Sequence, residues 1–197
     1  MKKYFPVLQH VNIPNLITTL GLAFGVAGCY FLTIGSLRGT ILCLSFAALM
    51  DLVDGFLAGK LNQRTIFGQE LDSLVDFFVC CIMPVLMMLV FVGNSILLIC
   101  AALFACACGL WRLANYNITA SEKRAYFTGL PVPGGAMLLA ISIWLVTYYD
   151  FPTWFCALVF FLTGLLMVSS LKLEKYGLWQ KAMWAAGLAF AVVVITS

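Results

Sequence analysis

Long runs of hydrophobic residues, separated by short polar breaks, make up most of this chain. Seven runs are each long enough to cross a bilayer as a helix. They cover residues 15–35, 38–60, 69–92, 94–116, 130–149, 152–170 and 179–196. The sixth is short, and the seventh begins with the polar Gln180 and Lys181. The pattern predicts an all-α integral membrane protein, with a bundle of six core transmembrane helices and a seventh helix at the C-terminus.

The composition supports a membrane protein and excludes a nucleic-acid-binding one. Hydrophobic residues make up 63% of the 197 residues and charged residues 10%, whereas roughly a quarter of a soluble domain is charged. The net charge is only +3, and no aromatic-basic RNA-binding motif is present. Connections between the runs are short, without repeats or low-complexity stretches. Residues 1–197 are therefore expected to form a single membrane-embedded domain.

The basic residues predict the orientation in the membrane. If the N-terminus is cytoplasmic, all of the 11 Lys and Arg residues except Arg38 fall on inner loops or membrane edges. The positive-inside rule therefore favours a cytoplasmic N-terminus in the cell inner membrane or an equivalent one. Residues 4–13 precede the first run and are expected to form a short interfacial segment. Pro14 then suits the first turn of the first helix.

Four aspartates interrupt the second and third hydrophobic runs: Asp51, Asp54, Asp72 and Asp76. A carboxylate inside a membrane span is costly and indicates a functional site. Residues three or four apart share a helical face, so each helix presents two carboxylates on one face near its cytoplasmic end. A short loop joins the two helices, which allows the two faces to meet.

A cluster of carboxylates without a nearby histidine or cysteine ligand favours a hard cation such as Mg²⁺, Mn²⁺ or Ca²⁺ over Zn²⁺. Two such ions can hold a diphosphate and stabilise charge on a transferred phosphoryl group. Gly55 and Gly68 flank the aspartates and leave room for a nucleotide. A divalent-cation transporter would use similar acids. Its path should continue across the bilayer, but the outer halves of these helices offer chiefly Ser45 and Asn94.

This arrangement resembles the signature of the CDP-alcohol phosphatidyltransferase family, D-x2-D-G-x2-A-R-x8-G-x3-D-x3-D. The segment from Asp51 to Asp76 matches every fixed position except one, because Gly59 stands where the family has an arginine. The segment 13–18, which contains Pro14, is also similar to the start of the first helix in this family. The resemblance extends from about residue 12 to 170 and leaves the last helix outside it.

Two later segments resemble the serine-specific branch of the family, the phosphatidylserine synthases. Residues 112–117 are similar to R-L-A-R-[FY]-N, with Asn115 in place of the second arginine, and residues 126–133 are similar to F-x-G-L-P-x-P. Pro131 and Pro133 also have a simpler interpretation as breakers before the fifth helix.

The resemblance implies roles for individual residues. Asp51, Asp54, Asp72 and Asp76 would bind two Mg²⁺ or Mn²⁺ ions, and Asp76 would also act as general base. The residues expected to line the CDP-lipid site are Asn15, Thr18, Gly55, Gly59, Thr65 and Gly68. The expected acceptor-binding residues are Arg112, Asn115, Asn117 and Lys123. Arg112 also fits a second interpretation, a cytoplasmic anchor at a helix end.

The implied reaction transfers a phosphatidyl group from CDP-diacylglycerol to the hydroxyl of L-serine and gives phosphatidylserine and CMP, with a homodimer as the expected assembly. Other acceptors, such as inositol phosphate, glycerol phosphate or choline, remain alternatives. Arg112, Lys123 and Arg124 provide a sparse basic pocket for a sugar phosphate, which favours serine. Gly59 and Asn115 raise a third alternative, a relative that binds CDP-lipid without turning it over.

Overall fold

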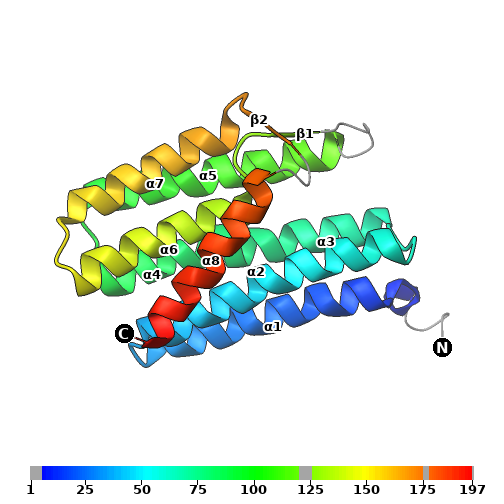
Figure 1. The fold of residues 1–197 in the computed structure, drawn as a ribbon, viewed down its shortest axis with the longest axis horizontal. Coiled ribbons are helices and arrows are strands. Elements are labelled where there is room, and N and C mark those ends of the chain that lie inside the picture. The colour runs from blue at the N-terminus through cyan, green and yellow to red at the C-terminus, as the bar shows by residue number, and fades with distance from the viewer. Residues whose placement is uncertain (1–5, 120–125, 175–177, 197) are drawn as a thin grey trace.

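The computed structural model describes residues 6–119, 126–174 and 178–196 (Figure 1). The chain forms a short 3-10 turn, η1, and then a bundle of helices. The helices are α1 (Ile13–Thr33), α2 (Leu37–Lys60), α3 (Ile66–Asp76), α4 (Met83–Phe91), α5 (Ile96–Thr119), α6 (Val132–Tyr148), α7 (Thr153–Val168) and α8 (Leu178–Thr196). A π-helical segment, η2 (Phe77–Ile82), joins α3 to α4, and η1 covers Pro6–His10.

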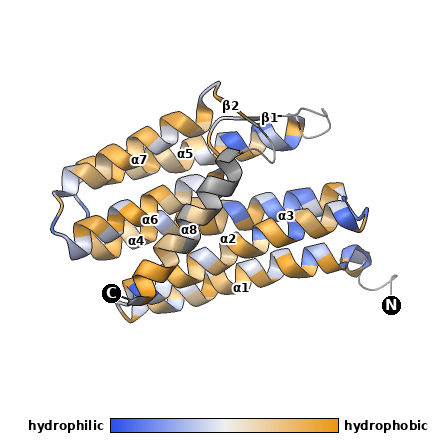
Figure 2. Cartoon of the chain, in the orientation of Figure 1, coloured by the Kyte–Doolittle hydropathy of each residue, from blue (hydrophilic) through white to orange (hydrophobic). Residues whose placement is uncertain are grey.

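Among the described residues, four helices are long and apolar enough to cross a membrane: α1, α2, the continuous rod Ile66–Phe91, and α5. Two shorter apolar helices, α6 and α7, lie at the predicted fifth and sixth hydrophobic runs. The protein is therefore an integral membrane protein with an all-helical bundle. Figure 2 shows the hydrophilic colour gathered toward the end of the bundle where α2 ends and α3 begins.

The helices α1 and α3 begin at residues whose side chains cap them. The Asn12 side chain accepts a hydrogen bond from the Asn15 amide at 2.9 Å, and Pro14 stands in the first turn of α1 as expected. Thr65 caps α3 in the same way, because its hydroxyl accepts from the Gly68 amide at 3.0 Å. These caps satisfy N–H groups that have no partner within the helix.

The helix α1 packs against both α2 and α3, and its small residues allow the close approach. Gly21, Gly25 and Gly28 are buried along one face of α1. A Cβ at Gly25 would lie 2.9 Å from Cγ2 of Val79 in the π-helical segment. Small residues at helix contacts are typical of membrane bundles, where close backbone packing replaces the hydrophobic effect.

The helix α8 crosses the bundle obliquely and packs against α2 and α6 (Figure 1). Phe190 of α8 meets the Trp144 ring edge-on, with the ring centroids 6.2 Å apart. α8 ends at the opposite end of the bundle from η1. The predicted seventh hydrophobic segment is thus a helix that lies on the outside of the other helices.

A short β-pair is the one addition to the predicted all-α fold. β1 (Tyr126–Thr128) and β2 (Lys172–Glu174) are antiparallel, with Phe127 opposite Leu173. Gly129 follows β1 with a φ of +75°, and a Cβ at this position would collide with the Met167 carbonyl oxygen. The structure therefore explains why the F-T-G-L-P segment has a glycine at position 129, because only glycine fits this backbone. Pro131 and Pro133 directly follow and start α6.

We expect Gly129→Ala to destabilise the protein more than Gly35→Ala. Gly35 also has a positive φ, +69°, but has open space around it. Backbone strain alone costs about 1–2 kcal/mol, so Gly35→Ala should lose roughly that amount. Gly129→Ala should lose more, because it adds the collision with Met167. The free energies of unfolding of the two variants in detergent measure the difference. Equal losses of stability would contradict a collision at Gly129.

Candidate active site

The structure brings three of the four predicted aspartates together between α2 and α3. Asp51, Asp72 and Asp76 each place one carboxylate oxygen within 4.8 Å of the other two. All three side chains are half-buried. At 1.5 Å per residue, Asp51 lies roughly 13 Å along α2 from Lys60. The cluster therefore lies inside the helical bundle, below the turn that joins the two helices.

Asp54 lies apart from this cluster and is held by α1. Its side chain is only 5% exposed, and its carboxylate accepts a hydrogen bond from the Thr18 hydroxyl. A buried carboxylate requires such a partner. Thr18, predicted to line the CDP-lipid site, is thus in contact with a predicted metal ligand. The role of Asp54 as a metal ligand stays a prediction.

Three residues predicted to line the CDP-lipid site meet at the start of α3. Oδ1 of Asn15 lies 2.7 Å from the position that a Cβ on Gly68 would occupy, and Oγ1 of Thr65 lies 3.2 Å from it. Any side chain at Gly68 would therefore displace Asn15. Gly55 on α2 has open space where its side chain would be. The bare backbone at Gly55 therefore leaves room for a ligand beside the carboxylates, whereas the space beside Gly68 is filled by Asn15.

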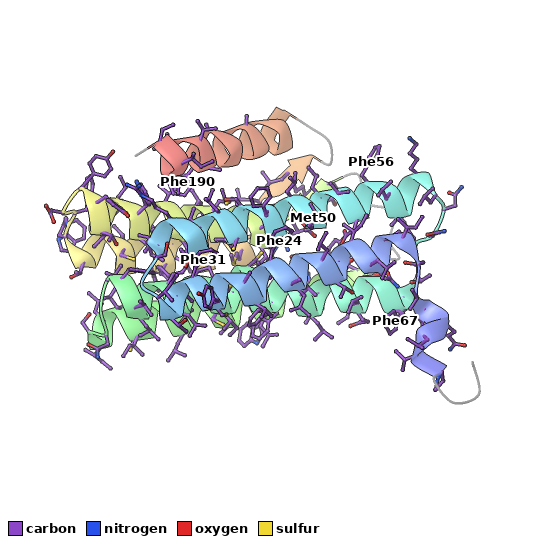
Figure 3. The ribbon with its side chains drawn as sticks, turned by 90° about the horizontal axis from the view of Figure 1, so that it is seen from below. Phe24, Phe31, Met50, Phe56, Phe67 and Phe190 are labelled. Atoms are coloured by element: carbon purple, nitrogen blue, oxygen red, sulfur yellow. The ribbon has the colours of Figure 1, made fainter. Side chains whose placement is uncertain are left out.

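The N-terminal turn η1 is attached to this end of the bundle. The His10 ring stacks on Phe67, with centroids 4.4 Å apart and an interplanar angle of 8°, and Figure 3 shows Phe67 beside the turn. The Asn15 side chain donates to the His10 carbonyl at 2.8 Å. The hydropathy pattern gave no signal for this contact, because stacking between separate segments leaves no mark on periodicity.

Arg112 of α5 lies near the carboxylates. Its charge interacts with Asp51 and Asp76. Its Nε is buried and has no hydrogen-bond partner among the described residues. A buried donor without a partner is uncommon and suits a bound anion. Acceptor binding by Arg112 stays a prediction.

The other predicted acceptor residues differ in their positions. The Asn117 amide is already engaged by α3, because its Oδ1 accepts from Ser73 at 2.8 Å and its Nδ2 donates to Glu70 at 3.2 Å. These bonds tie α5 to α3, so the geometry gives Asn117 a positioning role. Asn115 is exposed. Lys123 lies outside the described residues. Acceptor binding by these three residues stays a prediction.

The π-helical segment begins directly after Asp76 and was not foreseen. It places the buried Cys80 so that its thiol donates a weak hydrogen bond to Asp76 Oδ1, with a sulfur–oxygen distance of 3.8 Å. π-Helical turns are rare and often occur at functional sites. The only signal in the sequence was the four-residue spacing, which places Cys80 and Asp76 on one helical face.

A comparison with known protein families identifies the family of this chain. The sequence model of the CDP-alcohol phosphatidyltransferases matches residues 11–193. The chain belongs to this family. The match extends well past residue 170, so the expectation that the last helix lies outside the resemblance was wrong.

Relatives named as serine phosphatidyltransferases or an archaetidylserine synthase align with most of the chain. The CDP-diacylglycerol–serine O-phosphatidyltransferase of Methanocaldococcus jannaschii is 29% identical over 172 residues, which are 87% of this chain and 78% of that protein. The enzyme of the same name from Helicobacter pylori is 29% identical over 202 residues, with 98% and 83% covered. The archaetidylserine synthase of Methanothermobacter thermautotrophicus is 27% identical over 181 residues, with 86% and 72% covered.

The carboxylate cluster fits the divalent metal chemistry expected of a CDP-alcohol phosphatidyltransferase. Asp51, Asp72 and Asp76 offer only oxygen donors, and these donors converge on one point. Hard divalent cations prefer such ligands. Half-buried carboxylates packed this closely also repel each other, which a cation would relieve. The three aspartates are therefore the residues of this site best placed to hold a metal ion.

We expect Thr18→Val to destabilise the protein, because it leaves the buried Asp54 carboxylate without its hydroxyl donor. The loss should be about 1–3 kcal/mol, measured by unfolding in detergent. Thr19→Val is the matched control, since Thr19 is exposed and its hydroxyl bonds only to the Asn15 carbonyl of its own helix at 2.7 Å. Equal stability of the two variants would show that Asp54 does not depend on Thr18.

Proposed function

We propose that this protein transfers a phosphatidyl group from CDP-diacylglycerol to the hydroxyl of L-serine, giving phosphatidylserine and CMP. The observation that carries the proposal is the convergence of Asp51, Asp72 and Asp76 in a chain that belongs to the CDP-alcohol phosphatidyltransferases. Serine as acceptor is supported by the names of relatives that align with most of the chain. The buried, unpartnered Nε of Arg112 beside the cluster supports an acceptor with a carboxylate.

In the proposed reaction, Asp76 acts as general base. The serine hydroxyl oxygen forms a bond to the lipid-side phosphorus, and the bond from that phosphorus to the CMP oxygen breaks. The hydroxyl proton passes to the Asp76 carboxylate, and CMP leaves with the electron pair. A positioned base is effective only within hydrogen-bond reach of the proton it takes. The position of Asp76 beside Arg112 supports this role, since an acceptor bound to the guanidinium would lie next to the carboxylate.

Two Mg²⁺ or Mn²⁺ ions would be held by the four aspartates, Asp51, Asp54, Asp72 and Asp76. The ions would neutralise diphosphate charge and stabilise the leaving CMP. Asn15, Thr65 and Gly68 would receive the nucleotide where they meet at the start of α3. Arg112 would bind the serine carboxylate, because a guanidinium pairs with a carboxylate through two parallel hydrogen bonds.

The proposed membrane arrangement has six spanning helices, with the N-terminus and the active site facing the cytoplasm. The turn between α2 and α3 lies at the same end of the bundle as η1 (Figure 1), and nearly all basic residues are expected on that side of the membrane. Arg38, the one exception, lies beside the Tyr148 ring, 5.6 Å from its centroid. This location supports an interfacial Tyr148 at the outer side. A homodimer is part of the proposal.

CMP release by the purified protein tests the reaction. With CDP-diacylglycerol and Mg²⁺ or Mn²⁺, release should depend on L-serine and stop with EDTA. Asp76→Asn should lower the rate by roughly 10²–10⁴-fold, the usual contribution of a general base. The matched control is Asp150→Asn, an exposed aspartate with a φ of 53°, a conformation that asparagine also tolerates. Release that needs inositol phosphate, glycerol phosphate or choline would change the acceptor, and no release would contradict the proposal.

Arg112→Lys should raise the KM for serine about tenfold and leave the KM for CDP-diacylglycerol unchanged. Lysine keeps the charge but loses the paired hydrogen bonds to a carboxylate. Ethanolamine, which is serine without its carboxylate, serves as the comparison acceptor. The preference for serine over ethanolamine should narrow in the variant. An equal loss with both acceptors would contradict carboxylate binding and favour a general structural role for Arg112.

A further inference from the structure

Arg64 lies in the turn between α2 and α3, and its guanidinium extends back over Gly59. Nη2 lies 3.1 Å, and Nε 3.7 Å, from the position that a Cβ at residue 59 would occupy. The group therefore fills the space where a side chain at residue 59 would begin. Gly59 allows this approach because it has no side chain. The family signature has its arginine at position 59. The guanidinium of Arg64 therefore lies where the family arginine would begin.

The Arg64 guanidinium lies near the side of α2 that carries Asp51, because Gly59 beneath it is about 80° round the helix from Asp51. Tyr116 of α5 interacts electrostatically with Arg64 and also with Asp51 and Asp72. Arg64 is exposed, and no hydrogen bond or ion pair joins it to another residue in the described part of the chain. Its donors are thus available to a ligand that enters above the carboxylates.

Lys60, the neighbouring cation, lies on another face of α2. At about 100° per residue, Lys60 is about 180° round the helix from Asp51, whereas Gly59 is only about 80° away. The Lys60 ammonium lies 5.9 Å from the centroid of the Phe56 ring, and Phe56 is 64% exposed. Figure 3 shows Phe56 on the outer side of α2, away from α1. Lys60 is therefore poorly placed to act in the site.

We propose that Arg64 binds the diphosphate of the CDP-lipid from the α2–α3 turn, in the space that Gly59 leaves open. The proposal rests on the proposed function. A guanidinium binds phosphate oxygens through paired, charge-assisted hydrogen bonds. Arg112 interacts with Asp76 and is assigned to the acceptor, so the two arginines would bind different substrates of the proposed reaction. Residue 59 and Arg64 share one space, and a side chain in one position excludes the other.

Four variants, one of them a control, test this assignment in the protein in detergent. Arg64→Ala should raise the KM for CDP-diacylglycerol about tenfold, as expected for losing a charge-assisted hydrogen bond, with the KM for serine unchanged. Lys60→Ala is the matched control and should keep both values. Gly59→Arg in the Arg64→Ala background should restore most of the affinity for CDP-diacylglycerol. Gly59→Arg alone should not improve it, because two guanidinium groups would compete for the same space.

A direct binding measurement separates this assignment from the proposed reaction. The affinity for CDP-diacylglycerol is measured for the same variants, and their melting temperatures verify that they fold. A wild-type protein that binds CDP-diacylglycerol but releases no CMP, with weaker binding after Arg64→Ala, would refute the reaction and support the assignment. Active wild-type protein with unchanged affinity and KM in Arg64→Ala would overturn the assignment. If Gly59→Arg does not restore the affinity in the Arg64→Ala background, the claim that residue 59 and Arg64 occupy one space is wrong.

Discussion

The burial of four carboxylates among apolar helices is the constraint on which this structure depends. Each acid must find a donor or a cation, because an uncompensated charge inside a bundle is costly. Asp54 receives the Thr18 hydroxyl from α1, and Asp51 and Asp76 face the charge of Arg112 from α5. The close approach of Asp51, Asp72 and Asp76 then leaves a site suited to a divalent cation. Four helices, α1, α2, α3 and α5, are thus organised around these acids.

The contacts around the cluster position it relative to water and lipid. Asn117 joins α5 to α3 through Ser73 and Glu70, and His10 attaches the N-terminal turn to Phe67. Both contacts lie at the hydrophilic end of the bundle (Figure 2). A lipid donor approaches from the membrane and a small polar acceptor from water, so a cluster below this end is accessible to both. The proposed reaction requires this position, whereas a transport path would require polar residues along the whole bundle.

The helices and the acidic motif could be predicted from the sequence because both depend on local information. The length of each hydrophobic run determines where a spanning helix begins and ends, and α2 (Leu37–Lys60) agrees closely with the predicted 38–60. Spacings of three and four residues placed the aspartates on shared faces. The hydrogen bond from Thr18 to Asp54 and the β-pair depend on residues far apart in sequence. No local pattern encodes these contacts, and the π-helical segment after Asp76 has no sequence signature of its own.

Gly59 and Asn115 show why a motif should be examined in three dimensions. In the sequence motif, each of these two residues replaces an expected arginine and removes a positive charge. In the structure the two positions differ, because Asn115 is exposed on α5, whereas Gly59 is directly covered by the Arg64 guanidinium. A loss at one position can therefore be offset by a neighbour whose side chain enters the vacated space. The positive charge beside Gly59 can therefore be supplied by a residue at another sequence position, provided that its side chain reaches the same space.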